Sequence, residues 1–420
     1  MKAYVRTYGC TLNQADSDII TAALKNGGAA VAEDEKDADV LIFNTCTVKK
    51  ATSQKILYTL NRLSNSNRKL VVTGCMAGAN RDLIEKYAPN ASIITIPNVG
   101  EIASVASNAN ENKRMVLDSY SKRDRLSLFE SGSSIIAKVP VNDGCLSSCS
   151  FCETKPARGP LNSFSEELIL KAIRNSVEKG AKEIQLTSQD IGAYGMDKRT
   201  NIAQLMNKIA LIDGDFKVRI GMLNPEHLGK YLYEFLEALK SEKFYRFVHL
   251  PIQSGSNKVL KEMKRNYTVE EFNGHVEKLR ESLPELTIET DIIVGFPTET
   301  ENDFEKTLEF IGSTMPEVTN ISRYSARPHA SSSKMSQLPY DVINSRSHRL
   351  SRLVREVQHK INDRFIGKRF DVILTESNSR SINGRNRNYR QVVIVGDNSM
   401  QIGSVHNVLI NAASANVLYA

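Results

Sequence analysis

Short apolar, β-branched runs alternate with longer amphipathic stretches over the first hundred residues. The runs are residues 2–8, 39–44, 69–73 and 92–96, and helix-compatible segments such as 15–26 and 51–63 separate them. This alternation is typical of βαβ units, which build a parallel sheet. We therefore expect an α/β fold that begins with an open parallel-sheet domain over residues 1–100.

A second alternating series follows a polar stretch. Strand-like runs occur near 134–142, 182–188, 216–223, 245–252, 286–296 and 318–325, with amphipathic helices such as 164–180 and 300–314 between them. Six βα units of this kind predict a partial (β/α)6 barrel over residues 134–364, with function at the C-terminal ends of its strands. The polar residues 101–133 indicate a linker rather than a packed element.

The end of the chain changes character twice. Residues 340–364 predict one helix with Arg346, Arg349, Arg352 and Arg355 on roughly one side. From about residue 366, β-type runs are separated by Gly and Asn turns. Residues 365–420 are therefore expected to form a small all-β barrel module.

Composition sets wide bounds on the class of protein. The chain has 420 residues, enough for about two or three domains, and no apolar run approaches the roughly 20 residues of a membrane span. The opening MKAYVRTYGC lacks a secretory pattern, so we expect a cytoplasmic protein without a membrane partner. The net charge of +7 is compatible with a polyanionic partner but also with none.

All six cysteines lie in the first 152 residues. In a reducing compartment they favour metal binding or catalysis over disulfides. Cys10, Cys46 and Cys75 each follow a predicted strand of the first domain, and ligands gather beyond the carboxyl ends of such strands. The three could converge on one metal site, although a single cysteine at a strand end is often only a small buried hydrophobe.

The other three cysteines, Cys145, Cys149 and Cys152, form a C-x3-C-x2-C loop at the start of the predicted barrel. Three thiolates can hold three irons of a 4Fe–4S cluster and leave the fourth iron without a protein ligand. S-adenosylmethionine can fill that open position, and one electron then cleaves it to a 5′-deoxyadenosyl radical. Phe151 would shield the cluster from water. A zinc knuckle is disfavoured because the loop has no fourth Cys or His.

Together these motifs resemble the methylthiotransferase family of radical S-adenosylmethionine (radical SAM) enzymes. TYGCTLNQADSD, FNTCTV and VTGCMA resemble the family's cluster-binding domain, and GRNRNYRQVVIVG resembles the signature loop of its C-terminal TRAM domain. The resemblance implies two 4Fe–4S clusters: one at Cys10, Cys46 and Cys75 that carries or activates sulfur, and one at the barrel loop that makes the radical. The reaction replaces C–H by C–S–CH3 and uses two S-adenosylmethionine molecules.

Within the family, TYGCTLN and CLSSCSFCETKPARG look most like the archaeal and eukaryotic branch. That branch modifies N6-threonylcarbamoyladenosine at position 37, in the anticodon loop of tRNA, to its 2-methylthio form. Sister branches act on isopentenyladenosine in tRNA or on an aspartate of a ribosomal protein. An electron donor and a sulfur source are implied as further partners. A rival of another class is a metal-stabilised RNA-binding protein without catalysis.

Three further segments, LTSQDIGAYG, HLPIQSGS and DIIVGFPTET, resemble stretches of the family, and Arg219 lies on the strand after the first of them. The residues expected to contact S-adenosylmethionine are Gln189, Asp190, Arg219, His249, Gln253, Gly255 and Gly295. The polar side chains would bond the ammonium, ribose or carboxylate groups, and the glycines would let the backbone approach the adenosyl group. Alternatively, Asp190 is a helix cap, Arg219 forms a barrel salt bridge, and the glycines are ordinary strand ends.

The C-terminal module has the composition of an RNA-binding surface. Lys368, Arg385, Arg387 and Tyr389 suit phosphate contact and stacking on an unpaired base, although a basic hairpin is often only a solvated face. SARPHASS departs from the family's Arg-Pro-Gly-Thr, with His329 and Ala330 in place of Gly-Thr, which puts the shape of that loop in doubt.

Overall fold

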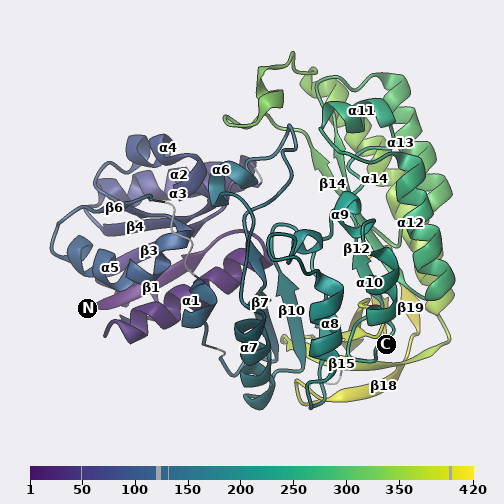
Figure 1. Ribbon diagram of the computed structural model, residues 1–420, viewed down its shortest axis with the longest axis horizontal. Coiled ribbons are helices and arrows are strands. Elements are labelled where there is room, and N and C mark those ends of the chain that lie inside the picture. Colours follow the sequence, from purple (N-terminus) through teal and green to yellow (C-terminus); the bar gives the residue numbers. More distant parts are fainter. Residues whose placement is uncertain (49, 120–123, 131, 397–399) are drawn as a thin grey trace.

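The computed structural model describes residues 1–48, 50–119, 124–130, 132–396 and 400–420. Three bodies lie side by side: an N-terminal α/β domain, a central barrel, and a small β-sheet module beneath the barrel (Figure 1). Across these described ranges, every helix is too short or too polar to cross a bilayer. The α/β class and the order of the three bodies confirm the expectation from the sequence.

The N-terminal domain is a six-stranded parallel sheet covered on both faces. Its strand order is β2 (Ala30–Val31), β1 (Lys2–Thr7), β3 (Val40–Thr45), β4 (Lys69–Gly74), β5 (Ser92–Ile94) and β6 (Val116–Leu117). Alternate residues of β3 point to opposite faces. Val40 and Ile42 pack under α1 (Thr11–Asn26) and α5 (Ile102–Asn110), whereas Leu41 and Phe43 pack under α2 (Lys50–Asn65) and α4 (Arg81–Tyr87).

The central domain is an open barrel of parallel strands with helices outside. The strands are β7 (Ile136–Pro140), β10 (Glu183–Thr187), β11 (Lys217–Arg219), β12 (Phe247–His249), β13 (Thr287–Val294) and β14 (Val318–Arg323). Single bridges between Val218 and Phe244 and between Met222 and His249 join the two three-stranded halves. The outer helices are α7 (Glu166–Glu178), α8 (Ile202–Ala210), α10 (Leu232–Leu239), α12 (Val269–Ser282), α13 (Glu301–Thr314) and α14 (Tyr340–Asn362).

The segment expected to be a linker is packed over much of its length. It contains α5, β6 and the 3-10 turn η3 (Arg125–Leu128), and Ile102, Val105 and Leu126 are buried. The prediction of a linker from the polar composition was wrong because the few apolar residues of this segment lie on its buried side. Residues 120–123 and 131 of the expected linker lie outside the described residues.

The C-terminal module is a curled sheet around its own apolar core. Its strand order is β18 (Val405–Leu409), β15 (Arg369–Ser377), β16 (Ser381–Asn386), β17 (Gln391–Val395), β20 (Leu418–Tyr419) and β19 (Ala412–Ala413). The turn between β16 and β17 docks on the barrel, where the Arg246 N–H donates to the Arg387 carbonyl at 2.9 Å. This sheet is consistent with a TRAM domain.

The arginine face expected on the long helix is partly used inside the protein. Arg346 of α14 is buried, and its guanidinium lies 2.8 Å from Glu299 and 3.0 Å from Glu301. Arg349 pairs with Glu301 and Glu305 of α13. These pairs hold α14 against α13, so these two arginines are already neutralised within the barrel.

Candidate functional site

Cys10, Cys46 and Cys75, which we call the N-terminal triad, converge at one edge of the first sheet. They follow β1, β3 and β4, which are adjacent strands. The sulfurs of Cys10 and Cys75 lie 3.9 Å and 3.7 Å from the same Asn13 Oδ1. Gly9 has φ +110°, and a Cβ at that position would come within 2.9 Å of the Cys46 sulfur. The glycine therefore leaves room for the third cysteine beside the other two.

Cys145, Cys149 and Cys152, the barrel triad, lie on the loop between β8 (Asn142–Asp143) and α6 (Thr154–Arg158). The triad lines a cavity of about 120 Å³ together with Phe151 and residues from the barrel strand ends. The Thr154 N–H donates to the Cys152 sulfur at 3.3 Å. All six cysteines are free of disulfides.

Both triads fit iron. Each offers three soft sulfur ligands, which suits a 4Fe–4S cluster with one open iron. Burial raises the pKa of Cys145 to about 12 and the pKa of Cys75 to about 11. Metal ions therefore have to displace the thiol protons, and nearby cations assist.

An arginine contacts a cysteine of each triad, and the two arginines are the buried Arg158 and the half-buried Arg265. Arg158 Nε donates to the Cys75 sulfur at 3.3 Å, and Arg265 Nη1 donates to the Cys149 sulfur at 3.4 Å. A positive hydrogen-bond donor favours the thiolate and, once a cluster is bound, raises its reduction potential. Both arginines belong to the central domain, although Cys75 belongs to the N-terminal domain.

Arg158 is part of a buried network of four charges between the two domains. Its guanidinium contacts Asp16 of α1 and lies 3.3 Å from Asp143 of β8. Arg125 lies 2.6 Å from each of the same two carboxylates. All four residues are buried. Two positive and two negative charges therefore balance inside the interface.

The network fixes the two triads relative to one another. Arg158 follows Cys152 by six residues and also donates to Asn13 Oδ1 at 2.9 Å. Helix α3 (Cys75–Ala79) packs on α6 so closely that a Cβ on Gly78 would lie 2.2 Å from the Ala157 carbonyl oxygen. The two cysteine loops are therefore neighbours across the domain interface, and the single residues Asp16, Arg125 and Asp143 gave no motif from which this could be inferred.

The residues expected from the LTSQDIGAYG and HLPIQSGS segments fall into two groups. Some line the cavity, and others hold neighbouring loops in place. Gln189 and Gln253 line the cavity, and Gln189 Oε1 is buried without a hydrogen-bond partner among the described residues. The Asp190 carboxylate lies at the cavity wall but is bonded to His227 Nδ1 at 2.6 Å and to the Asn224 N–H at 3.0 Å. Asp190 therefore holds a second loop in place rather than extending freely toward a ligand.

Arg219 of β11 and His249 of β12 are not among the residues that line the cavity, although His249 is bridged to Met222, which does line it. The Arg219 guanidinium is 5.1 Å from the Phe247 ring centroid. The other role that the sequence left open for Arg219 was a salt bridge inside the barrel. Arg219 forms no such salt bridge with the described residues.

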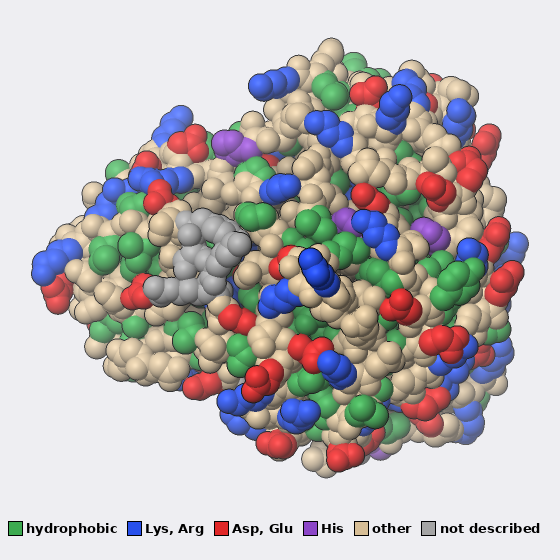
Figure 2. All heavy atoms as spheres, viewed as in Figure 1, with side chains coloured by type: hydrophobic (Ala, Val, Ile, Leu, Met, Phe, Trp, Pro, Cys, Tyr) green, Lys and Arg blue, Asp and Glu red, His purple; other side chains and the backbone are tan. Residues whose placement is uncertain are grey.

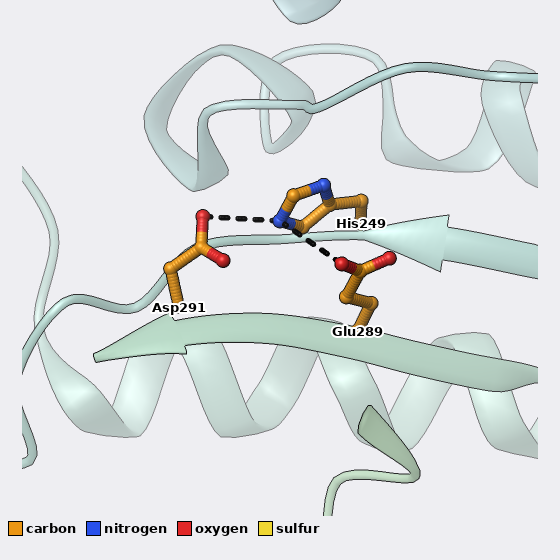
Figure 3. A group of neighbouring side chains, drawn as sticks. All are labelled: His249, Glu289 and Asp291. Atoms are coloured by element: carbon orange, nitrogen blue, oxygen red, sulfur yellow. Dashed lines mark hydrogen bonds and ion pairs between the residues drawn. The ribbon is translucent and has the colours of Figure 1, made fainter. Parts of the chain in front are cut away.

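His249 belongs to a polar cluster with Glu289 and Asp291 (Figure 3). Both carboxylates come from β13 and point toward the imidazole, whose Nε2 lies 3.0 Å from Asp291 and 3.9 Å from Glu289. Burial lowers the pKa of His249, but the hydrogen bond and charge of Asp291 and the charge of Glu289 raise it above its usual value. Asn320 Nδ2 donates to both carboxylates. The three ligand-type side chains thus satisfy one another and Asn320.

The two glycines expected beside the adenosyl group have packing roles. A Cβ on Gly255 would lie 2.6 Å from the Lys306 carbonyl oxygen of α13. Gly295 has φ +80°, and a Cβ there would lie 2.5 Å from the Ile343 side chain of α14. Both positions need glycine because helices approach the strand ends closely. Contact of either glycine with the adenosyl group stays a prediction.

The RNA-binding residues expected in the C-terminal module differ in accessibility. The Tyr389 ring packs against two barrel side chains, with its centroid 4.8 Å from that of Tyr245 and 4.9 Å from that of Phe247. In this position the ring is not free to stack on a nucleobase. Arg385 lies 5.2 Å from the Tyr389 ring centroid, and Arg387 pairs with Glu242. Lys368 is exposed. On the face drawn in Figure 2, basic and acidic side chains are interspersed over the surface.

The SARPHASS loop reaches back to both triads. The His329 N–H donates to Glu153, next to Cys152, at 3.3 Å, and Ala330 is buried. Arg327 donates to the Val48 carbonyl oxygen, two residues after Cys46. The altered pair His329 and Ala330 therefore sits in an ordered loop that bridges the domains.

Known proteins are similar in sequence to this chain over almost its whole length. Residues 2–95 match "Uncharacterized protein family UPF0004", and residues 139–311 match the Radical SAM superfamily. A "Probable threonylcarbamoyladenosine tRNA methylthiotransferase" from Pyrococcus abyssi is 37% identical over 95% of both chains. One from Archaeoglobus fulgidus is 40% identical over 94% of this chain and 93% of its own. The Homo sapiens "Threonylcarbamoyladenosine tRNA methylthiotransferase" is 33% identical over 94% of this chain and 69% of its own.

Solved structures share the fold at low identity. The radical S-adenosylmethionine methyltransferase TsrM from Kitasatospora setae, with cobalamin and a [4Fe-4S] cluster bound, superposes with a TM-score of 0.60 at 14% identity. The superposition covers 79% of this chain and 73% of the TsrM chain. Membership of the Radical SAM superfamily implies S-adenosylmethionine and one 4Fe–4S cluster, which the barrel triad suits. By its relatives and its six cysteines, the chain belongs to the threonylcarbamoyladenosine tRNA methylthiotransferase family of radical SAM enzymes.

Proposed function

We propose that this protein is a tRNA methylthiotransferase that converts N6-threonylcarbamoyladenosine at position 37 to its 2-methylthio derivative. The observation that carries this proposal is the pair of free cysteine triads that meet across the domain interface, with Arg158 next to one and bonded to the other. A radical enzyme that only abstracts hydrogen has no need of the second triad. The curated relatives supply the identity of the base.

Two 4Fe–4S clusters are the cofactors of this proposal, one on each triad, together with S-adenosylmethionine. When bound, these groups supply a radical that removes a hydrogen atom from an unreactive C–H bond and the sulfur and methyl groups that replace it. Acid–base chemistry would not suffice, because an aromatic C–H is a poor acid.

The chain's own residues position and protect these groups. Arg158 and Arg265 stabilise the Cys75 and Cys149 thiolates through charged hydrogen bonds. Phe151 lies at the cavity wall, where its ring excludes water. Gln189 offers a buried, unpartnered oxygen to a cation or hydroxyl in the cavity.

The polar cluster of His249 and Asp291 adjoins the cavity, because these residues are joined through the backbone to Met222 and Gln253 in its wall. The cluster holds its charges in place beside the cavity without lining it. Lys368 and Arg385 remain our candidates for contact with the tRNA phosphates, whereas Tyr389 is committed to the barrel. A cytoplasmic setting suits six reduced cysteines.

Anaerobic reconstitution followed by reaction with three substrates tests this function. The substrates are tRNA that carries N6-threonylcarbamoyladenosine, tRNA that carries isopentenyladenosine, and a ribosomal protein. We expect methylthiolation of the first only, and reaction of either other substrate instead would contradict the proposal. About eight irons per chain are expected, whereas zinc, or no cleavage of S-adenosylmethionine with dithionite, would indicate a non-catalytic RNA-binding protein.

A further inference from the structure

A second cavity lies on the other side of the barrel-triad loop. It has a volume of about 520 Å³, and Ser147 and Ser148 of the loop line both this cavity and the one that contains the cysteines. The loop is therefore a thin wall between the two spaces. All residues that line the second cavity belong to the central domain. We call this second cavity the lysine cleft.

Three lysines give the lysine cleft its charge. Lys230, Lys261 and Lys264 are exposed, and none of them forms an ion pair with another described residue. Among the described residues that line the cleft, Glu226 is the one carboxylate, and it accepts a hydrogen bond from Asn266 at 3.1 Å. The cleft therefore presents a surplus of positive charge that the protein itself does not neutralise.

An exposed leucine lies among these lysines. Leu146 directly follows Cys145 on the loop and is 43% exposed. The Leu146 carbonyl oxygen accepts a hydrogen bond from Lys155 of α6 at 3.4 Å, which ties the loop to that helix. A small apolar centre with a charged surround suits a weak, short-lived protein contact, which buries less than about 1,200 Å².

The turn that presents the lysines outward is bonded to the cluster ligands inward. Lys261 and Lys264 belong to the end of α11 (Asn257–Glu262) and the turn after it, and the next residue, Arg265, donates to the Cys149 sulfur. The Ser150 N–H and hydroxyl donate to the Met263 and Glu262 carbonyl oxygens at 3.0 Å and 2.8 Å. A partner docked in the cleft would thus contact residues bonded to the barrel-triad loop without entering the cavity that the cysteines line.

We propose that the lysine cleft docks a small acidic protein that carries single electrons, and that electrons reach the barrel-triad cluster through the Leu146–Ser148 wall. One electron leaves the reduced carrier and one enters the cluster, with no bond formed or broken in that step. Opposite charges speed such encounters by about 10- to 1000-fold at low salt. An RNA partner is disfavoured because the target base must reach the cysteine cavity on the other side of the wall.

The inference rests on the radical chemistry of the proposed function. Measurements with two different reductants distinguish a failure of the docking proposal from a failure of the proposed function. The test variant combines Lys230→Glu, Lys261→Glu and Lys264→Glu. The control variant combines Lys171→Glu, Lys278→Glu and Lys306→Glu, which are exposed lysines on the outer helices α7, α12 and α13. S-adenosylmethionine cleavage is measured anaerobically with reduced acidic ferredoxin and, separately, with dithionite.

With ferredoxin, the test variant should lose about 10-fold or more in kcat/KM at low salt, and the loss should shrink at high salt. With dithionite, which needs no docking site, cleavage should match that of the unmodified protein and of the control. Equal ferredoxin kinetics in test and control variants would overturn the proposal. So would loss of tRNA affinity with normal ferredoxin kinetics, or loss of dithionite-driven cleavage in the test variant alone. Absence of cleavage in the unmodified protein would instead refute the proposed function.

Discussion

Removal of Arg158 should damage the domain interface far more than removal of an exposed cation. In Arg158→Met, the buried Asp16 and Asp143 share only the Arg125 guanidinium, so one negative charge of the network has no partner. Breaking a buried ion pair from one side costs about 3–5 kcal/mol because the remaining charge stays buried and unpaired. The contacts to Cys75 and Asn13 are lost in the same variant.

Anaerobic calorimetry at one fixed scan rate measures this effect. At roughly 2–4 °C per kcal/mol, the first unfolding transition should fall by roughly 6–20 °C. The matched control is Lys208→Met, which removes an exposed partner of Glu166 and should change the transition little. Iron bound at the N-terminal triad should also fall in Arg158→Met, since a positive donor to Cys75 is missing.

A second substitution distinguishes charge imbalance from lost packing. Asp16→Asn placed on top of Arg158→Met removes the uncompensated carboxylate, so the double variant should be more stable than the sum of the two single losses predicts. Strict additivity, or a Tm for Arg158→Met equal to that of the Lys208→Met control, would refute the role of the buried network.

Three further predictions concern other parts of the molecule. Cys75→Ala should lose about four irons and all methylthiolation while S-adenosylmethionine cleavage continues, and loss of cleavage as well would show that the triads are not separate sites. The pKa of His249 is raised, so its ion pair with Asp291 stabilises the fold fully below about pH 6.5 and this contribution is lost as the pH rises through the folded-state pKa. Melting curves between pH 5.5 and 8 should therefore show a smaller decline for Asp291→Asn than for the unmodified protein, and identical slopes would contradict the assignment. Tyr389→Ala should destabilise the protein by about 3 kcal/mol through the cavity it leaves, whereas Tyr389→Phe should keep both most of the stability and the tRNA affinity in a filter-binding assay. A loss of affinity in Tyr389→Phe would show that its hydroxyl contacts RNA after all.

The sequence predicts the architecture well because its strands are short, β-branched and regularly spaced. The rule that ligands gather at the carboxyl ends of parallel strands correctly places Cys10, Cys46 and Cys75 together: Asn13 lies beside Cys10 and Cys75, and Gly9 lies beside Cys46. The same reasoning fails for residues 101–133, where a few apolar side chains are enough to pack a polar segment.

The fine structure of the site depends on contacts distant in sequence. Arg158 and Cys75 are 83 residues apart, and Arg265 and Cys149 are 116 apart, so no local pattern could pair them. Gly255 and Gly295 show the opposite problem. Their segments carry a family signature, but the reason for glycine is a helix packed on the strand end, which only the three-dimensional structure reveals.

The proposed reaction can be tested in cells that lack this protein by mass spectrometry of their tRNA nucleosides. We expect 2-methylthio-N6-threonylcarbamoyladenosine to disappear and N6-threonylcarbamoyladenosine to accumulate, with recovery when the intact gene is returned but not with the Cys75→Ala variant. Persistence of the 2-methylthio-N6-threonylcarbamoyladenosine peak, or loss of a methylthiolated isopentenyladenosine in its place, would contradict the proposed reaction.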